Sequence, residues 1–85
     1  MEKTYLKINR ADSVVVCLEA MKKGDVVEVD GKTVTLNQDT PAGHKVLITD
    51  APAGTNIIKY GYPIGHAITD LKAGDWVNEN NLKTN

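Results

Sequence analysis

Hydrophobic residues occur in short segments along the 85-residue chain, and a recurring four-residue turn pattern separates these segments. Each copy of the pattern is followed within three residues by a β-branched residue, and the copies are Lys22–Asp25, Pro41–His44, Pro52–Thr55 and Lys72–Asp75. Residues 40–43 and 51–54 fit type I turns, with proline at the second position and glycine at the fourth. This spacing predicts a small, turn-rich β module that is an accessory piece of something larger.

The hydrophobic segments themselves predict strands. Residues 5–8 alternate in polarity, as a half-buried strand does. Residues 26–36 predict a hairpin, because the Asp30-Gly31 dipeptide tolerates the positive φ of a type I′ turn. Residues 61–65 are expected to form a kinked corner, since Pro63 donates no hydrogen bond and the segment begins and ends with a glycine. Further strands are expected over residues 44–50, 57–60 and 76–77.

Residues 12–23 have a helical pattern. Asp12 or Ser13 can cap the start of a helix, and Gly24 can end it. The β-branched run at residues 14–16 lowers helix propensity and is the counter-signal. We expect one short helix here, because four apolar residues would share one of its faces, namely Val14, Cys17, Leu18 and Met21.

Residues 78–85 form a polar tail in which Leu82 is the one apolar anchor. Three interpretations are open. A partner subunit captures the tail, the tail leads into a longer chain, or it frays at the end of the domain.

Composition narrows the class of protein. The length allows one domain, and a core without phenylalanine must be built from Val, Ile, Leu and Ala. The net charge is −1 and the basic residues are scattered, which argues against a nucleic-acid partner. Cys17 is the single cysteine, so no internal disulfide can form, and its apolar neighbours predict a buried, inert thiol. We expect a cytoplasmic protein without a membrane partner, because neither a signal-peptide pattern nor a bilayer-length apolar run is seen.

The chain carries none of the usual catalytic motifs, and two histidines are the main candidates for chemistry. His44 follows a turn and precedes Lys45, and such a pair at a strand mouth can bind or protonate a carboxylate or hydroxyl of a small acid. The alternative is an exposed turn histidine. His66 is interpreted as covering the corner, and two histidines among scattered acids do not specify a metal site.

Tyr60 and Tyr62 flank Gly61, so an extended backbone would send both rings to one face. The two rings can line a sugar-like ligand. They can also pack at a domain interface or in the core, where an apolar body with a polar tip is useful.

A series of short motifs is spread over nearly the whole chain. These are Gly43-His44-Lys45-Val46, Thr49-Asp50, Ala53-Gly54, Ile58-Lys59-Tyr60-Gly61, Pro63-Ile64-Gly65, Ala67 and Ala73-Gly74, together with the hairpin stretch 25–39. In order and spacing they resemble the N-terminal domain of the altronate dehydratase family. Galactarate dehydratase and the small subunits of sugar-acid and sulfolactate dehydratases are similar.

The resemblance implies a SAF-type domain with a β-clip fold, which precedes or accompanies a much larger catalytic domain. The reaction it implies is the conversion of D-altronate to 2-keto-3-deoxy-D-gluconate plus water, with divalent iron or manganese, in hexuronate catabolism. The family's Gly-His-Lys motif falls on Gly43, His44 and Lys45. Its Tyr-Gly motif falls on Tyr60-Gly61, and its Ile-Gly motif on Ile64-Gly65.

The chain departs from the family pattern near its end. A His-x-His-Asn run of altronate dehydratase falls here on Asn78, Glu79, Asn80 and Asn81. An asparagine amide is a weaker ligand for iron than an imidazole. We therefore assign no metal-binding residues to this chain.

Together these patterns predict that residues 1–85 form a single, mainly β, β-clip (SAF-like) domain with one short helix, the N-terminal part of a longer dehydratase. His44 and Lys45 are the candidate catalytic residues, and Tyr60, Gly61 and Tyr62 the candidate substrate-binding residues. The domain alone is not expected to be catalytic, because elimination of water needs more groups than this chain offers. Iron or manganese would belong to the full-length enzyme. The alternatives are a separate small subunit of a related enzyme such as sulfolactate dehydratase, and a non-catalytic carbohydrate-binding β-clip module.

Overall fold

The computed structural model describes residues 4–84, and within them the chain forms nine strands and no helix. This confirms the mainly β class. None of the described residues belongs to a helix that could cross a membrane. The strands are β1 (Tyr5–Leu6), β2 (Val14–Cys17), β3 (Val26–Val29), β4 (Lys32–Thr35), β5 (Lys45–Leu47), β6 (Asn56–Lys59), β7 (Tyr62–Ala67), β8 (Trp76–Val77) and β9 (Leu82–Lys83).

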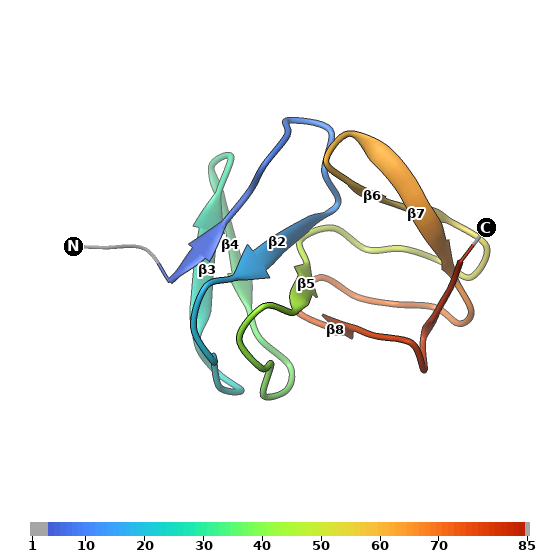
Figure 1. The fold of residues 1–85 in the computed structure, drawn as a ribbon. Helices are drawn as coiled ribbons and strands as arrows, with labels where there is room; N and C mark the ends of the chain where they lie inside the picture. Colours follow the sequence, from blue (N-terminus) through green and yellow to red (C-terminus); the bar gives the residue numbers. More distant parts are fainter. Residues whose placement is uncertain (1–3, 85) are drawn as a thin grey trace.

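The strands form three antiparallel sheets. The central sheet has the order β1-β2-β5-β8, β3 and β4 form one hairpin, and β6 and β7 form a second hairpin to which β9 is added. Figure 1 shows the β3–β4 hairpin to the left of the central strands and the β6–β7 hairpin to the right. Each hairpin covers one face of the central sheet.

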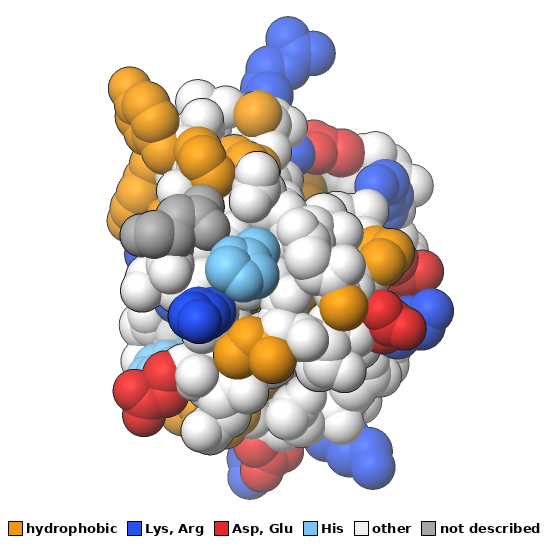
Figure 2. All heavy atoms as spheres, turned by 90° about the vertical axis from the view of Figure 1, so that its right-hand side faces the viewer, with side chains coloured by type: hydrophobic (Ala, Val, Ile, Leu, Met, Phe, Trp, Pro, Cys, Tyr) orange, Lys and Arg blue, Asp and Glu red, His pale blue; other side chains and the backbone are white. Residues whose placement is uncertain are grey.

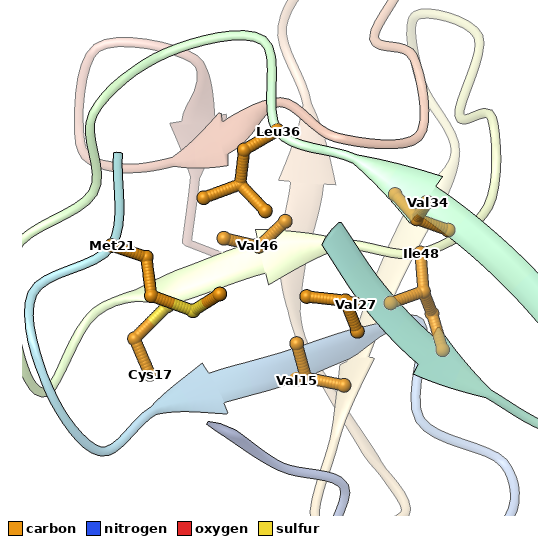
Figure 3. Close-up of a cluster of buried hydrophobic side chains, with 8 residues drawn as sticks. All are labelled: Val15, Cys17, Met21, Val27, Val34, Leu36, Val46 and Ile48. Carbon is orange, nitrogen blue, oxygen red and sulfur yellow. The ribbon is translucent and has the colours of Figure 1, made fainter. Parts of the chain in front are cut away.

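The pairing register explains why the domain has two cores. Val15 pairs with Val46, and Val46 with Trp76, so these residues share one face of the central sheet. The alternate residues face the other way. The first face packs against the β3–β4 hairpin (Figure 3) in a cluster of Val15, Cys17, Met21, Val27, Val34, Leu36, Val46 and Ile48. The second face packs against the β6–β7 hairpin in a cluster of Val14, Leu47, Ala51, Ile57, Ala67, Leu71 and Val77.

The helix predicted over residues 12–23 is wrong, because residues 14–17 form strand β2. Val14 and Val15 are both fully buried, one in each cluster, while Leu18 is exposed. A strand covered on both faces buries consecutive apolar residues. The β-branched run at residues 14–16 therefore indicated the correct element. The helix-like spacing of the apolar residues arose because β2 is buried on both faces. Cys17 is buried as expected, and burial raises the pKa of its thiol.

Residues 14–44 and 45–75 repeat the same series of elements, a strand, a turn, a hairpin and a second turn. Equivalent backbone hydrogen bonds hold both copies. A glycine N–H near the start of each hairpin donates to the far end of that hairpin, in Gly24 to Leu36 (2.9 Å) and Gly54 to Ala67 (2.8 Å). In each copy an isolated bridge also joins the two turns, Met21 with Thr40 and Ala51 with Leu71.

The four recurrent turns are type II, and the two that contain proline lie one residue later than the type I turns predicted for residues 40–43 and 51–54. In each turn the fourth residue donates its N–H to the carbonyl of the first, as His44 does to Pro41 and Asp75 does to Lys72. The glycine therefore stands third, where φ is between 82° and 100°. A type II turn needs positive φ at this position, which explains the recurrent glycine.

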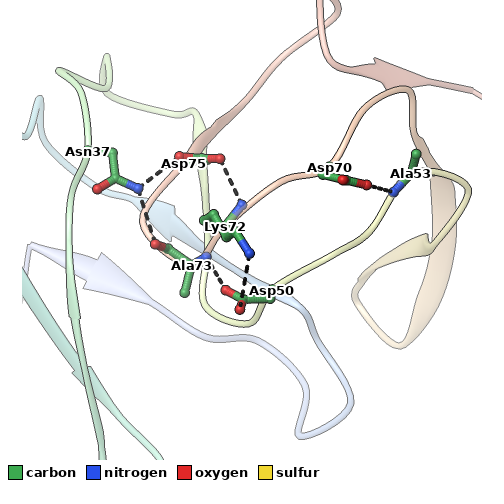
Figure 4. Close-up of polar contacts among 7 residues, drawn as sticks. All are labelled: Asn37, Asp50, Ala53, Asp70, Lys72, Ala73 and Asp75. Carbon is green, nitrogen blue, oxygen red and sulfur yellow. Dashed lines mark hydrogen bonds and ion pairs between the residues drawn. The ribbon is translucent and has the colours of Figure 1, made fainter.

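Aspartates cap three of the four turns, and Figure 4 shows two of these contacts, Ala53 with Asp70 and Ala73 with Asp50. The N–H of the second turn residue donates to a carboxylate that precedes the opposite turn, in the pairs Lys23 with Asp39 (2.9 Å), Ala53 with Asp70 (2.8 Å) and Ala73 with Asp50 (3.0 Å). By the same repeat, Ala42 faces the position of Ala20, which carries no carboxylate. The Pro41–His44 turn therefore lacks the side-chain acceptor of the other three.

Both hairpins turn through two residues with positive φ, Asp30-Gly31 (54° and 77°) and Tyr60-Gly61 (56° and 79°). The first hairpin confirms the prediction. The kinked corner predicted over 61–65 is wrong, because β7 runs from residue 62 to 67 with a bulge opposite the Ile57–Ile58 step. Pro63 pairs with Ile58 one step from the turn, where an antiparallel pair exchanges no hydrogen bonds. The proline at this position therefore removes no hydrogen bond from the β6–β7 pairing.

Residues 78–84 are held by the domain itself. β9 pairs with β7, and a Cβ on Gly65 would lie 2.4 Å from the Lys83 carbonyl oxygen, so only glycine permits this approach. Fraying is therefore the wrong interpretation for these residues. Residue 85 lies outside the described residues, and capture by a partner or continuation of the chain stays a prediction.

Candidate functional site

His44 is the last residue of the second turn and precedes β5. In the two Lys-x-Gly-Asp turns the fourth residue caps the turn, because Asp25 and Asp75 accept the N–H of the first residue at 2.9 and 2.8 Å. Pro41 has no N–H, so position four of its turn is released from this role. The same holds for Thr55 in the third turn. The sequence therefore places a histidine where the fold needs no particular side chain.

Trp76 fixes the His44 ring. Its indole Nε1 donates to His44 Nδ1 at 3.1 Å, and the two rings pack edge to face with centroids 5.5 Å apart. An indole N–H can only donate, so Nδ1 accepts and the proton of the neutral imidazole lies on Nε2. Trp76 is itself held in place, because its backbone N–H donates to Gln38 Oε1 at 3.2 Å.

The loop after β8 completes a hollow beside His44. The amides of Asn78 and Asn81 donate to the Trp76 carbonyl at 3.1 and 2.8 Å, which folds the loop against the end of β8. Glu79 and Asn80 are thereby exposed at the rim. The hollow has a volume of about 430 Å³ and is lined by His44, Lys45, Trp76, Val77, Asn78, Glu79 and Asn80.

Lys45 faces the opposite side of the central sheet from His44. It pairs with Val16 and Val77 and is half-buried, on the face of the central sheet that the β6–β7 hairpin covers. Burial lowers the pKa of the Lys45 ammonium, and the nearby charge of Lys59 lowers it further. The surroundings of Lys45 therefore disfavour its protonated, positively charged form.

The tip of the β6–β7 hairpin carries exposed aromatic rings. Tyr60 is 51% exposed and Tyr62 is 73% exposed. The tip is fixed from below, because the buried Asp12 accepts the Gly61 N–H at 2.8 Å. Lys59 Nζ lies 4.8 Å from the centroid of the Tyr60 ring. In Figure 2 hydrophobic side chains gather at the upper left, at the height where Figure 1 draws this hairpin, and histidine, basic and acidic side chains lie together lower on the same side.

The structure separates the predicted site residues into two groups. His44 and Lys45 line the hollow, whereas Tyr60, Gly61 and Tyr62 lie at the hairpin tip outside its lining. No observation assigns either group a role, so both remain predictions. Sequence reasoning missed four residues around them, namely Lys59, Trp76, Glu79 and Asn80. The only tryptophan of the chain, directly after a recurrent turn, was a signal that could have been used.

The described residues do not fit an iron or manganese site. Within residues 4–84 no group of three His, Cys, Asp or Glu side chains could hold a metal ion. Asn78, which falls on the first histidine of the resembled run, has a structural role, since its Oδ1 accepts the Asn80 N–H and its N–H donates to Asn81 Oδ1, both at 2.9 Å. We therefore derive no step through a metal held by this chain.

Comparisons with known proteins agree on one family. The family model described as the altronate/galactarate dehydratase SAF domain matches residues 3–85. The altronate dehydratase of Escherichia coli K12 is 48% identical over 81 residues, covering 95% of this chain and 16% of that protein. The altronate dehydratase of Bacillus subtilis 168 is 34% identical over 83 residues, covering 98% of this chain and 17% of that protein. The (2R)-sulfolactate sulfo-lyase subunit alpha of Paracoccus pantotrophus is 39% identical over 51 residues, covering 60% of this chain and 76% of that subunit.

These matches define the class of protein as a SAF domain of the dehydratase type. The chain belongs to the altronate/galactarate dehydratase SAF domain family. It spans about one sixth of the length of the altronate dehydratases that it matches.

Proposed function

We propose that this chain is the accessory SAF domain of a sugar-acid dehydratase and acts together with a larger catalytic part. The family match over residues 3–85 carries the proposal, supported by the small share of altronate dehydratase that the chain spans. The proposed reaction of the whole enzyme converts D-altronate to 2-keto-3-deoxy-D-gluconate plus water. Residues 1–85 would then be the N-terminal domain of that enzyme.

The domain alone is not catalytic in this proposal. Elimination of water removes a proton from C2 and the hydroxyl from C3 as water, and the enol that remains becomes the 2-keto group. A base, an acid at the leaving hydroxyl and a pocket that excludes water are all needed. The open hollow beside His44 supplies at most one of these groups. The larger part would supply the others and the iron or manganese ion.

We assign His44 the role of a hydrogen-bond donor that positions a sugar-acid oxygen. The Nε2–H is available because Trp76 occupies Nδ1. An imidazolium would carry a proton on Nδ1 as well, and the bond from the indole would be lost. The contact with Trp76 therefore suits a neutral, positioning histidine better than a proton donor.

The test compares His44→Ala with Thr55→Ala in the full-length enzyme, since both residues stand fourth in a Pro-Ala-Gly turn. We expect His44→Ala to lower kcat/KM for D-altronate roughly 10- to 100-fold, the effect of losing one hydrogen bond to a charged ligand. Thr55→Ala should leave it unchanged. Trp76→Phe keeps the ring but removes the N–H, and it should cause a smaller loss of the same kind.

Two results would count against the proposal. An unchanged kcat and KM in His44→Ala removes the role of His44. A full-length enzyme that dehydrates neither altronate nor galactarate, with ferrous or manganous ion added, removes the proposed function.

A separate small subunit is the second candidate, and one observation favours it. The alignment covers 76% of the sulfolactate sulfo-lyase alpha subunit, so a domain of this type also exists as a polypeptide of its own. The reading frame of the gene separates the two candidates. A frame that continues far past residue 85 supports the fused domain, and a stop there supports the subunit.

A further inference from the structure

The Pro41–His44 turn lacks a hydrogen bond that the other three recurrent turns have. In those three turns an aspartate carboxylate accepts the N–H of the second turn residue, at 2.8 to 3.0 Å. The equivalent N–H here belongs to Ala42, and within the described part of the chain nothing accepts it. Ala42 is exposed, and the residue that the repeat places opposite its N–H is Ala20. A backbone donor is therefore presented without the acceptor that this fold otherwise provides.

The second half of the domain shows what occupies this place when the acceptor is present. Asp50 stands where Ala20 stands in the first half, and its Oδ1 accepts the Ala73 N–H at 3.0 Å. Its Oδ2 lies 3.9 Å from the Lys72 ammonium (Figure 4). One carboxylate thus meets both a backbone donor and a positive charge. The same pair of turns also holds the carboxylate of Asp70, so two carboxylates fit across it.

In the first half a hollow of about 390 Å³ lies at the equivalent place. The residues that line it include Ala20, Lys22, Asp39, Pro41 and Trp76. Lys22 is exposed, and none of the carboxylates in residues 4–84 forms an ion pair with it. Asp39 already has a donor, because its Oδ1 accepts the Lys23 N–H at 2.9 Å. The hollow therefore brings a positive charge beside the Ala42 N–H, and one carboxylate is missing from it.

We propose that an aspartate or glutamate side chain of the larger catalytic part enters this hollow and accepts the Ala42 N–H, with Lys22 as its charge partner. The inference rests on the proposed function, which includes such a part. The carboxylate takes the place that Asp50 fills in the second half. Trp76 lines both this hollow and the hollow beside His44, so a catalytic part bound here lies next to the candidate site.

The weakness of the contact favours a protein side chain over a free sugar acid. A hydrogen bond to a charged group raises a binding constant by roughly 10- to 100-fold. Even a millimolar dissociation constant needs a binding constant of about 1,000 M⁻¹. A side chain on a linked part is held at a high effective concentration, so it binds despite the modest affinity. The experiment must nevertheless distinguish it from the carboxylate of the sugar acid, which has the same chemistry.

Two variants of the full-length enzyme remove the contact in different ways. Ala42→Pro deletes the N–H and keeps the turn, because the second position of a type II turn accepts proline. Ala20→Asp supplies a carboxylate from within the domain, which fills the place and repels an incoming carboxylate. Thr69→Asp is the matched control, since it adds the same charge at an exposed position of the second half, where both turns already have their acceptors.

A protease site placed after residue 85 frees the domain within the folded enzyme, and size-exclusion chromatography then follows its dissociation. We expect Ala42→Pro and Ala20→Asp each to speed dissociation roughly tenfold or more, because a hydrogen bond to a charged group is lost. Lys22→Met should have a smaller effect, since an exposed ion contact is weaker. Thr69→Asp should dissociate as the parent does. If the gene ends at residue 85, the natural complex with the larger subunit replaces the cut enzyme.

The Tm of the 85-residue chain separates a binding loss from unfolding. Ala42→Pro should not lower the Tm, because its N–H has no acceptor within the domain, and Ala20→Asp should raise it. Ala53→Pro is the same substitution in the other Pro-Ala-Gly turn, and it should lower the Tm because Asp70 loses its donor. Ala20→Asp would thus stabilise the domain alone and weaken its attachment to the catalytic part. A general folding defect does not produce these opposite signs.

The proposal is overturned if neither Ala42→Pro nor Ala20→Asp speeds dissociation. It is also overturned if they do so only with D-altronate present, because the carboxylate then belongs to the sugar acid. A loss of kcat/KM in His44→Ala would in either case leave the proposed function standing. If the full-length enzyme dehydrates no hexonate, yet both variants speed dissociation, the proposed function falls and the carboxylate site stands.

Discussion

The two halves of the domain, residues 14–44 and 45–75, share one backbone design and differ in how they complete it. Both contain a strand, a type II turn, a hairpin with two residues of positive φ, and a second type II turn. In the first half the hairpin tip is held by an ion pair between Lys7 and Asp30. In the second half the buried Asp12 holds the tip, and aromatic rings are exposed there.

The outer edges of the two hairpins are also held by different residues that make equivalent hydrogen bonds. In the first hairpin the Tyr5 hydroxyl accepts the N–H of Glu28 at 2.9 Å and donates to its carbonyl at 3.2 Å. In the second, the backbone and hydroxyl of Ser13 make the equivalent two bonds to Ile58. The backbone requirement is the same, because an unpaired strand edge must find donors and acceptors. The side chains that meet it are free to differ.

This freedom separates structural positions from candidate functional ones. His44 ends the first half and Lys45 begins the second, so both lie where the halves join. Lys59 and Tyr60 occupy the second hairpin, where the first hairpin has Val29 and Asp30. Residues that break the repeat thus include the candidate functional residues. Where the two halves have the same type of residue, that residue is required by a turn or by a hydrophobic core.

The largest expected effect comes from a pair of equivalent-looking turn glycines. A Cβ on Gly74 would lie 2.2 Å from the Thr35 carbonyl oxygen, whereas a Cβ on Gly24 meets nothing within 4 Å. Both residues have positive φ, so alanine at either position strains the backbone by roughly 1–2 kcal/mol. We expect Gly74→Ala to lower the free energy of unfolding by roughly 3–5 kcal/mol in total, because the clash adds to the strain.

Urea unfolding followed by Trp76 fluorescence measures both glycine variants. Gly24→Ala is the matched control, with an expected loss of roughly 1–2 kcal/mol. Equal losses in the two variants would contradict the close approach between the fourth turn and β4.

The sequence predicted those parts of the fold that depend on local residues. The Asp30-Gly31 turn and the strands around it were expected, because positive φ and period-two alternation are local properties. β2 was mistaken for a helix, because burial of Val14 and Val15 on opposite faces depends on two hairpins far along the chain. The turn type was misassigned for a related reason. Proline suggested where each turn begins, but the hydrogen bond that defines it was not visible.

The candidate site was predictable only in part. His44 stood out because it follows a turn and lies beside Lys45. Its partner Trp76 lies 32 residues away in sequence and reaches it through the β5–β8 pairing. Ser13 likewise binds Ile58 at the edge of β6, 45 residues further along the chain. Such pairings arise from tertiary structure, and no spacing within one segment encodes them.

A smaller effect is expected where the repeat is incomplete. Ala20 stands where Asp50 stands in the second half, and Asp50 accepts the Ala73 N–H at 3.0 Å. Ala20→Asp should offer the same acceptor to Ala42. We expect it to raise the free energy of unfolding by about 0.5–1 kcal/mol and the Tm by about 3–6 °C.

Calorimetry of the 85-residue chain tests the Ala20 variant. Asp50→Ala is the opposite change and should lower stability by about 1 kcal/mol. Ala20→Asn separates the hydrogen bond from the charge. If Asp50→Ala destabilises while Ala20→Asp has no effect, the two halves are not equivalent at this turn.

The smallest effect concerns the alkaline side of the stability profile. Burial, and then the charge of Lys59, lowers the pKa of Lys45 in the folded domain below its value in the unfolded chain. Between these two pKa values the unfolded chain binds more protons, so the free energy of unfolding should rise as the pH increases through this window. Lys59→Met removes the smaller cause and should make the rise shallower, while Lys23→Met should leave it as in the parent. Urea unfolding at intervals from roughly pH 8 to 11 measures the slope. A slope that Lys59→Met leaves unaltered would mean that the two ammonium groups do not interact in the folded domain.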